Sequence, residues 1–221
     1  MLLDEIDTPF NNAWKRERGW LHYRAWLQKQ IDEPIFWETF SLKQIYVPLR
    51  GFYEEEEINI DIVPLFEGVQ DPIIPQFTRI PANYQMANAE HYIRERSPNG
   101  FTMRTELQLA LEYDGKFAGA LSFHTLDLDS GKAEIGYWLT ADTRGKGVAT
   151  AAVRLLTEYG FESIGFHRIE ALVVSSNLPS LKVLKNAGYM QEGIKRDACC
   201  QDDGTREDMV LFAAIRTDWG R

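Results

Sequence analysis

Two glycines separated by one lysine, in the segment Arg144-Gly145-Lys146-Gly147, are the residues of this chain whose types and spacing most directly indicate chemistry. Glycine adopts positive φ at little steric cost, so Gly145 and Gly147 let the backbone turn with its N–H groups pointing inward. An amphipathic helix pattern begins near Val148, and the N-terminus of a helix carries partial positive charge. The segment therefore predicts an anion cradle, for which a diphosphate is a suitable ligand.

This cradle does not match the two common phosphate-binding loops. A Walker loop has four residues between its glycines and a lysine followed by serine or threonine, whereas one residue separates Gly145 from Gly147. A dinucleotide fingerprint needs a third glycine at its own spacing and an acidic residue closing the next strand, and the sequence has neither. The pattern predicts a pyrophosphate-binding turn of another family.

The segments around the cradle follow one another in a recognisable order. They are Glu134-Ile135-Gly136-Tyr137-Trp138-Leu139, the cradle to Ala149, His167 to Ala171, Asn177 to Ser180, Asn186 to Tyr189 and Glu192-Gly193. This order resembles the acetyl-CoA signature of the GNAT superfamily of N-acetyltransferases, in particular the branch that acetylates the N-termini of ribosomal proteins. The resemblance covers roughly the last two thirds of the chain and is more specific than an isolated glycine-rich loop.

The resemblance implies acetyl-CoA as co-substrate and no metal. It places the pyrophosphate on backbone N–H groups from Arg144 to Ala149, with the Arg144 and Lys146 side chains adding charge. It also implies that a backbone N–H near Trp138 or Leu139, splayed from the neighbouring strand by a bulge, holds the reaction's oxyanion. The implied cofactor-binding residues are Trp138, Leu139, Thr140, Arg144, Gly145, Lys146, Gly147, Val148, Ala149, Thr150 and Asn177.

Two catalytic side chains are implied, Glu134 and Ser180. Glu134 stands where several family members carry the carboxylate that deprotonates the amine through water, a role that needs a pKa raised by desolvation. Its alternative is an ordinary salt-bridging residue. Ser180 matches a serine that hydrogen-bonds the CoA sulfur, or it satisfies free N–H groups of the first helical turn. His124 is a second candidate base, and His167 is expected to cap or space a strand.

The elements that must position these residues become clear after residue 107. Apolar residues alternate with other residues before Asp114-Gly115, and a second apolar run follows it, which predicts a hairpin. Further strands are predicted at 133–139, 168–174, 189–197 and 207–215, with helices over 148–163 and from Leu178 onward. Asn177 can cap the second helix and Gly188 can end it. We predict an α/β (α+β) GNAT fold, a mixed, mostly antiparallel sheet flanked by helices, with an N-terminal helical extension.

The predicted division is an aromatic-rich extension over 1–57 and the acetyltransferase domain over 58–221. Trp20, Tyr23, Trp26 and Leu27 recur at helical spacing, which predicts packing against the adjacent domain, a second subunit or another partner. The first 50 residues also have a faint likeness to segments that precede the NTPase module of some bacterial NACHT-type proteins. Alternation of Ile58, Ile60 and Ile62 predicts an opening strand, and the prolines at 64, 72, 75 and 81 leave little room for a helix.

Composition limits the function further. The chain has 221 residues, 44% hydrophobic and 26% charged, with a net charge of −9, which argues against nucleic acid and suits amine substrates. Cys199 and Cys200 are adjacent, so they form neither a disulfide framework nor a spaced metal site, and a reducing cytoplasm fits them. Without an apolar span or signal-like start, the protein is expected to be neither secreted nor membrane-inserted.

The resulting hypothesis is an N-acetyltransferase that moves acetyl from acetyl-CoA to a primary amine by direct attack in a ternary complex. A protein or peptide N-terminal α-amine is the first expected acceptor, and a polyamine or amino-sugar is the alternative. A non-catalytic acyl-CoA-binding or protein-interaction module remains the alternative of another class. The orientation of Glu134 relative to the cradle separates these classes.

Overall fold

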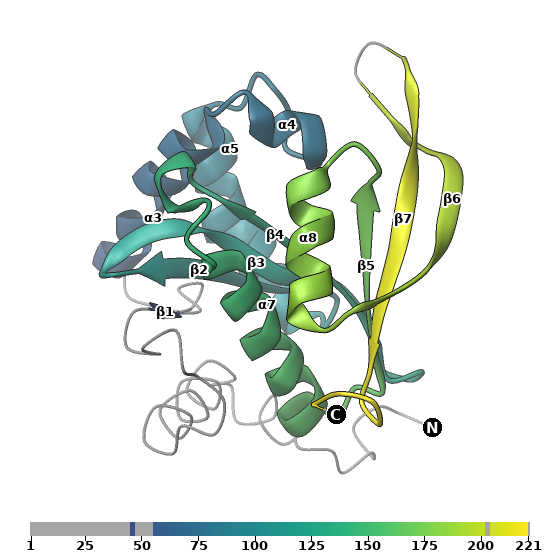
Figure 1. Ribbon diagram of the computed structural model, residues 1–221. Helices are drawn as coiled ribbons and strands as arrows, with labels where there is room; N and C mark the ends of the chain where they lie inside the picture. The colour runs from purple at the N-terminus through teal and green to yellow at the C-terminus, as the bar shows by residue number, and fades with distance from the viewer. Residues whose placement is uncertain (1–44, 47–54, 202–203, 221) are drawn as a thin grey trace.

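The computed structural model describes residues 45–46, 55–201 and 204–220, with side chains described from residue 61 onward. Its centre is a seven-stranded sheet in the order β1-β2-β3-β4-β5-β7-β6 (Figure 1). The strands are β1 Ile45–Tyr46, β2 Leu107–Tyr113, β3 Lys116–Asp127, β4 Lys132–Leu139, β5 Arg168–Val174, β6 Met190–Cys200 and β7 Arg206–Ile215. Neighbouring strands are antiparallel except for β4 and β5, which are parallel. The predicted mixed, mostly antiparallel sheet is confirmed.

The predicted hairpin between β2 and β3 turns at two residues in left-handed conformation. Asp114 has φ 54° and Gly115 has φ 73°. Two successive positive φ values belong to the tight turn whose twist matches that of the flanking strands. Strand prediction succeeded here because alternation and turn chemistry agree over adjacent residues.

Helices cover both faces of the sheet. Their bounds are α3 Glu55–Val69, α4 Ile73–Phe77, α5 Met86–His91, η3 Tyr92–Arg96, α6 Ser97–Thr102, η4 Ala141–Thr143, α7 Val148–Tyr159, η5 Gly160–Ile164 and α8 Leu178–Ala187. Figure 1 shows α7 and α8 side by side over one face, while α3, α4 and α5 gather at the other. The larger apolar core lies between the sheet and α7 and α8. A smaller core joins α3, α4 and α5 to Phe117 and Trp138 of the sheet.

The strand predicted around Ile58 to Ile62 is wrong, because the structure places these residues in α3. Ile62, Leu65 and Val69 are all buried, at spacings of three and four residues that match a helix. Pro64 lies inside α3, where it removes one backbone hydrogen bond but does not end the helix. Burial of the apolar face in the smaller core offsets that loss.

The aromatic stripe predicted within residues 1–50 lies outside the described residues. Of this region, the structure describes only Ile45 and Tyr46 of β1. The domain boundary after residue 57 and the role of the extension stay predictions. Among the helices that the structure describes, none is both long and apolar enough to cross a membrane.

Candidate functional site

The glycine-rich turn leads directly into α7. Gly145 has φ 76°, and Gly147, the N-cap of α7, has φ 79° without a capping side chain. The N–H of Ala151 donates to the carbonyl oxygen of Gly147, so the N–H groups of Val148, Ala149 and Thr150 precede the first bond of the helix. Val148 and Ala149 are buried. N–H groups without a partner inside the helix, at its N-terminus, suit the predicted diphosphate cradle.

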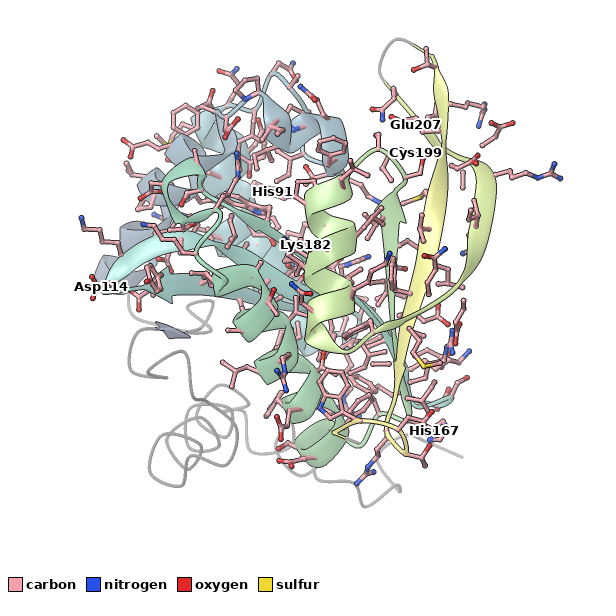
Figure 2. The ribbon with its side chains drawn as sticks, viewed as in Figure 1. His91, Asp114, His167, Lys182, Cys199 and Glu207 are labelled. Carbon is pink, nitrogen blue, oxygen red and sulfur yellow. The ribbon has the colours of Figure 1, made fainter. Side chains whose placement is uncertain are left out.

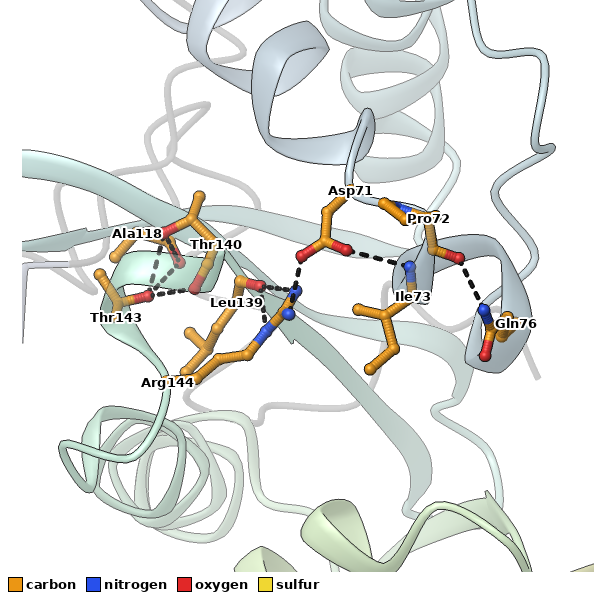
Figure 3. Close-up of polar contacts among 9 residues, drawn as sticks. All are labelled: Asp71, Pro72, Ile73, Gln76, Ala118, Leu139, Thr140, Thr143 and Arg144. Atoms are coloured by element: carbon orange, nitrogen blue, oxygen red, sulfur yellow. Dashed lines mark hydrogen bonds and ion pairs between the residues drawn. The ribbon is translucent and has the colours of Figure 1, made fainter.

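The Arg144 side chain contacts groups outside the glycine turn (Figure 3), and its role in binding the diphosphate stays a prediction. Its Nε and Nη2 donate to the carbonyl oxygen of Leu139 over 3.1 and 2.8 Å, and Nη1 lies 2.7 Å from Oδ2 of Asp71. The backbone N–H of Ile73 and the Arg144 guanidinium hold the pKa of Asp71 below its ordinary value. Arg144 therefore joins the end of β4 to the turn before α4, beside a cavity of about 290 Å³.

Other predicted cofactor residues also make contacts within the protein. The N–H of Thr140 donates to Ala118, and its hydroxyl lies 3.0 Å from that of Thr143 (Figure 3). The Nζ of Lys146 lies over the Tyr113 ring, 5.7 Å from its centroid. The backbone cradle and the charge contributed by Lys146 both stay predictions for this turn.

The strands β4 and β5 pair over only three residues. Their register runs from Lys132 opposite Arg168 to Glu134 opposite Glu170, and β4 then continues to Leu139 without β5 beside it. Pairing with β3 continues throughout this stretch. Among the strands that the structure describes, none pairs with this second edge of β4, immediately before the cradle.

The hydrogen-bond alternation of β4 decides which N–H groups face this free edge. The N–H of Thr140 donates to the carbonyl oxygen of Ala118 on β3. Because hydrogen-bonded and non-bonded pairs alternate along an antiparallel ladder, the N–H of Trp138 also points toward β3. The N–H groups of Tyr137 and Leu139 point away from β3. Of the two positions predicted for the oxyanion donor, this register favours Leu139 over Trp138. The expected bulge lies elsewhere, on β3 at His124, where the register shifts between Phe123 and Thr125.

Tyr137 and Trp138 point to opposite faces. Trp138 packs in the smaller core, 5.9 Å from Phe117 between ring centroids. The Tyr137 hydroxyl lies 2.8 Å from Oγ of Ser180 at the start of α8. Burial raises the pKa of Tyr137 to about 12, so its hydroxyl keeps its proton near neutral pH. Sequence reasoning missed this pairing because the two residues belong to different elements.

Asn177 and Ser180 build the N-terminus of α8. Oδ1 of Asn177 accepts from the N–H of Ser180 over 3.2 Å, which confirms the predicted cap. Gly188 ends the helix at φ 99°, also as predicted. The Ser180 hydroxyl thus sits on the α8 face of the sheet, across from Tyr137 and beside the free edge of β4.

Glu134 lies on the opposite face, paired with His124. Oε1 of Glu134 is 3.1 Å from Nε2 of His124, and both side chains are about one fifth exposed, at 22% and 23%. The hydrogen bond from His124 lowers the pKa of Glu134, although burial acts in the other direction. A direct base would need a raised pKa, and Glu134 has a lowered one.

The charges around Glu134 are largely positive. His124, Arg79 and Lys195 all lower the pKa of Glu134 through their charge. Glu170, its neighbour on β5, pairs with Arg168 at 2.5 Å. The carboxylate of Glu170 is thus paired with a cation, and the positive charges near Glu134 favour its anionic form.

The remaining reactive side chains lie apart from this site. Figure 2 shows His167 near the C-terminal tail, whereas Cys199 and Glu207 lie toward the other end of the β6–β7 hairpin. His167 is exposed and its backbone links β5 to its neighbours, in agreement with a spacing role. Cys199 and Cys200 are both free. Within the described ranges, no group of three or more His, Cys, Asp or Glu side chains could hold a metal ion.

Comparison with protein families gives two matches. The acetyltransferase (GNAT) domain family matches residues 49–190, well over half of the chain. The family described as NACHT N-terminal helical domain 3 matches residues 1–42, the region of the faint likeness to NACHT-type proteins.

Individual relatives agree with the first match. YdaF of Bacillus subtilis (strain 168), provisionally named a ribosomal N-acetyltransferase, is 35% identical over 113 residues, which cover 51% of this chain and 61% of YdaF. The chain thus spans only about three fifths of that relative's length. The microcin C7 self-immunity acetyltransferase MccE, solved with acetyl-CoA and AMP, is 25% identical at a TM-score of 0.60 over 78% of this chain and 92% of MccE.

A third similarity concerns the fold. RimL, a ribosomal L7/L12 α-N-protein acetyltransferase solved with coenzyme A, superposes with a TM-score of 0.67 at 18% identity, covering 78% of this chain and 94% of RimL. The overall fold thus recurs in a solved acetyltransferase. On the family match over residues 49–190, this chain belongs to the acetyltransferase (GNAT) domain family.

Proposed function

We propose that this protein transfers an acetyl group from acetyl-CoA to a primary amine, most readily a protein or peptide N-terminal α-amine, by direct attack in a ternary complex. The observation that carries the proposal is the free edge of β4 next to the glycine cradle. With its diphosphate bound at the N-terminus of α7, acetyl-CoA would lie with its acetyl-bearing arm along this edge. The carboxylate–imidazole pair lies on one face of β4 and the Ser180–Tyr137 pair on the other.

This two-faced arrangement supplies what amide formation needs. The amine approaches from the His124–Glu134 side, where its proton can be accepted. The Leu139 N–H faces the free edge and can stabilise the oxyanion. The Ser180 hydroxyl, backed by the protonated Tyr137, can donate a hydrogen bond to the departing sulfur. A binding-only module would have no need of paired proton-transfer groups on both faces.

The charges at the site support an α-amine over a polyamine. An α-amino group has a pKa of about 8, whereas alkylamines resemble lysine at about 10.4, so more of the α-amine is neutral near pH 7. Arg79 and Lys195 near Glu134 also oppose a ligand with several positive charges. The assignment to ribosomal proteins is suggested by the name of YdaF.

Calorimetric titration with acetyl-CoA, followed by thiol release with N-terminal peptides, polyamines and amino-sugars, tests the function. We expect saturable binding and thiol release that depends on the amine, fastest with peptides. Thiol release only with polyamines or amino-sugars would show that these amines, and not peptide N-termini, are the acceptors. Binding without release for any amine would instead indicate the acyl-CoA-binding module.

Ser180→Ala tests the sulfur-side contact. Because the contact strengthens as charge develops on sulfur, we expect kcat to fall about tenfold while the Kd for acetyl-CoA changes less than about threefold. Ser130→Ala is a control, since it removes an exposed hydroxyl in the turn between β3 and β4. Equal loss of binding and turnover in Ser180→Ala would remove the assigned role.

A further inference from the structure

The contact between His124 and Glu134 fixes how the imidazole carries its proton. Nε2 of His124 lies 3.1 Å from Oε1 of Glu134. An ionised carboxylate can only accept a hydrogen bond, so Nε2 of the neutral ring carries the hydrogen. The other nitrogen, Nδ1, is then unprotonated and able to accept a proton.

Nδ1 lies over Gly136 of β4. A Cβ built on Gly136 would be 2.8 Å from Nδ1 and 3.1 Å from Cε1 of His124, so glycine leaves the room that the imidazole occupies. Gly136 is two residues beyond Glu134, the last β4 residue that pairs with β5. The basic nitrogen therefore stands where the free edge of β4 begins.

The bulge on β3 contributes to this placement. The register of β3 against β4 shifts between Phe123 and Thr125, so His124 is the extra residue. Bulges redirect a side chain without breaking the sheet. In this structure the redirected side chain is an imidazole that reaches Glu134 and covers Gly136.

We propose that His124 is the catalytic base, which takes the amine proton on Nδ1, and that Glu134 is a positioning residue that fixes the tautomer and stabilises the imidazolium. This inference deepens the proposed function and rests on it. It replaces the direct role predicted for Glu134. Gly136 is required because a larger residue would displace the ring.

The proton and electron balance of the step is complete. One proton of the substrate ammonium passes to Nδ1 of His124, and the nitrogen lone pair then forms a bond to the thioester carbonyl carbon. Collapse of the tetrahedral intermediate breaks the carbon–sulfur bond. The second nitrogen proton ends on the thiolate, and His124 returns its proton to water.

The electrostatics at Glu134 agree with this division of roles. A carboxylate that accepts a hydrogen bond from His124 and lies near Arg79 and Lys195 is stabilised as an anion, which makes it a weak proton acceptor. The dyad thus resembles, in logic, carboxylates that orient a histidine base in hydrolases.

Kinetics of His124→Ala, Glu134→Ala and the double variant test the assignment. We expect His124→Ala to lower kcat at least about 100-fold with little change in the Kd for acetyl-CoA, and added imidazole to restore part of the rate. Glu134→Ala should lose about tenfold and gain nothing from imidazole. The double variant should match His124→Ala. His91→Ala is the matched control, because His91, at the end of α5, pairs with Glu95 of η3 at 3.2 Å and both side chains are mostly exposed.

A second readout does not depend on turnover. Nitrogen NMR of the neutral ring should show His124 protonated on Nε2 in the wild type and on Nδ1 in Glu134→Gln, whose amide can donate to Nε2. The chain has four histidines, and the signal lost in His124→Ala identifies the right one. Protonation on Nδ1 in the wild type would overturn the proposal.

The kinetic outcomes separate two failures. If the wild type is active and His124→Ala stays within about threefold of it while Glu134→Ala is inactive, Glu134 is the direct base and only this inference falls. If the wild type binds acetyl-CoA but releases no thiol with any amine, the proposed function falls and the base assignment with it.

Discussion

Gly147→Trp is expected to abolish detectable acetyl-CoA binding. Gly147 has φ 79° at the N-cap of α7, where an indole would occupy the space in front of the first helical N–H groups. Hydrogen bonds to a charged group contribute about 1.5–3 kcal/mol each, so losing two raises Kd by about 100-fold or more. Calorimetric titration with acetyl-CoA measures the change.

Gly165→Trp is the matched control for Gly147→Trp. Gly165 also has positive φ, at 90°, with no heavy atom within 4 Å of a built Cβ. It follows η5, beyond the far end of the 12-residue α7, and thus at least about 18 Å along the axis from the cradle. Gly165→Trp should bind acetyl-CoA normally. Retained binding in Gly147→Trp would place the diphosphate elsewhere.

The cradle and most strands were predictable because their signals are local. Gly145 and Gly147 fall within one turn, and the hairpin at Asp114 and Gly115 combines alternation with residues that tolerate positive φ. The start and end of α8 were likewise marked by neighbouring residues. In each case the sequence pattern and the structure depend on contacts a few residues apart.

The strand predicted at Ile58 to Ile62 failed for a related reason. Apolar residues at every second position over five residues also fall partly on one helical face, so a short run does not separate the two periods. Burial of Leu65 and Val69 extends the helical spacing past Pro64. Contacts across the smaller core decided the outcome.

The chemistry of the site depended on contacts that no local pattern carries. Arg144 pairs with Asp71 in the turn before α4, and the Tyr137 hydroxyl contacts Ser180 at the start of α8. Glu134 was predicted as a base from its position alone, whereas its pKa depends on a histidine brought beside it by a bulge on another strand. Spatial neighbours, more than residue type, set these roles.

Gly119→Ala is expected to destabilise the folded protein strongly. A Cβ on Gly119 would lie 2.1 Å from the carbonyl oxygen of Trp138 and 2.9 Å from Cα of Leu139, and φ of Gly119 is 143°. These contacts are with backbone, so β3 and β4 would have to separate just before the cradle. We expect a loss of at least about 3 kcal/mol in the free energy of unfolding, measured by urea denaturation.

Gly165→Ala separates the clash at Gly119 from the general cost of positive φ. Gly165 has φ 90° but open space around a built Cβ, so alanine there should cost only about 1 kcal/mol. If Gly119→Ala were no less stable than Gly165→Ala, β3 and β4 could not approach as closely as the structure shows. Because the same approach positions Leu139 at the free edge, any folded fraction of Gly119→Ala should also bind acetyl-CoA weakly. Stability and binding would then fail together, since one strand pair supports both the sheet and the cradle.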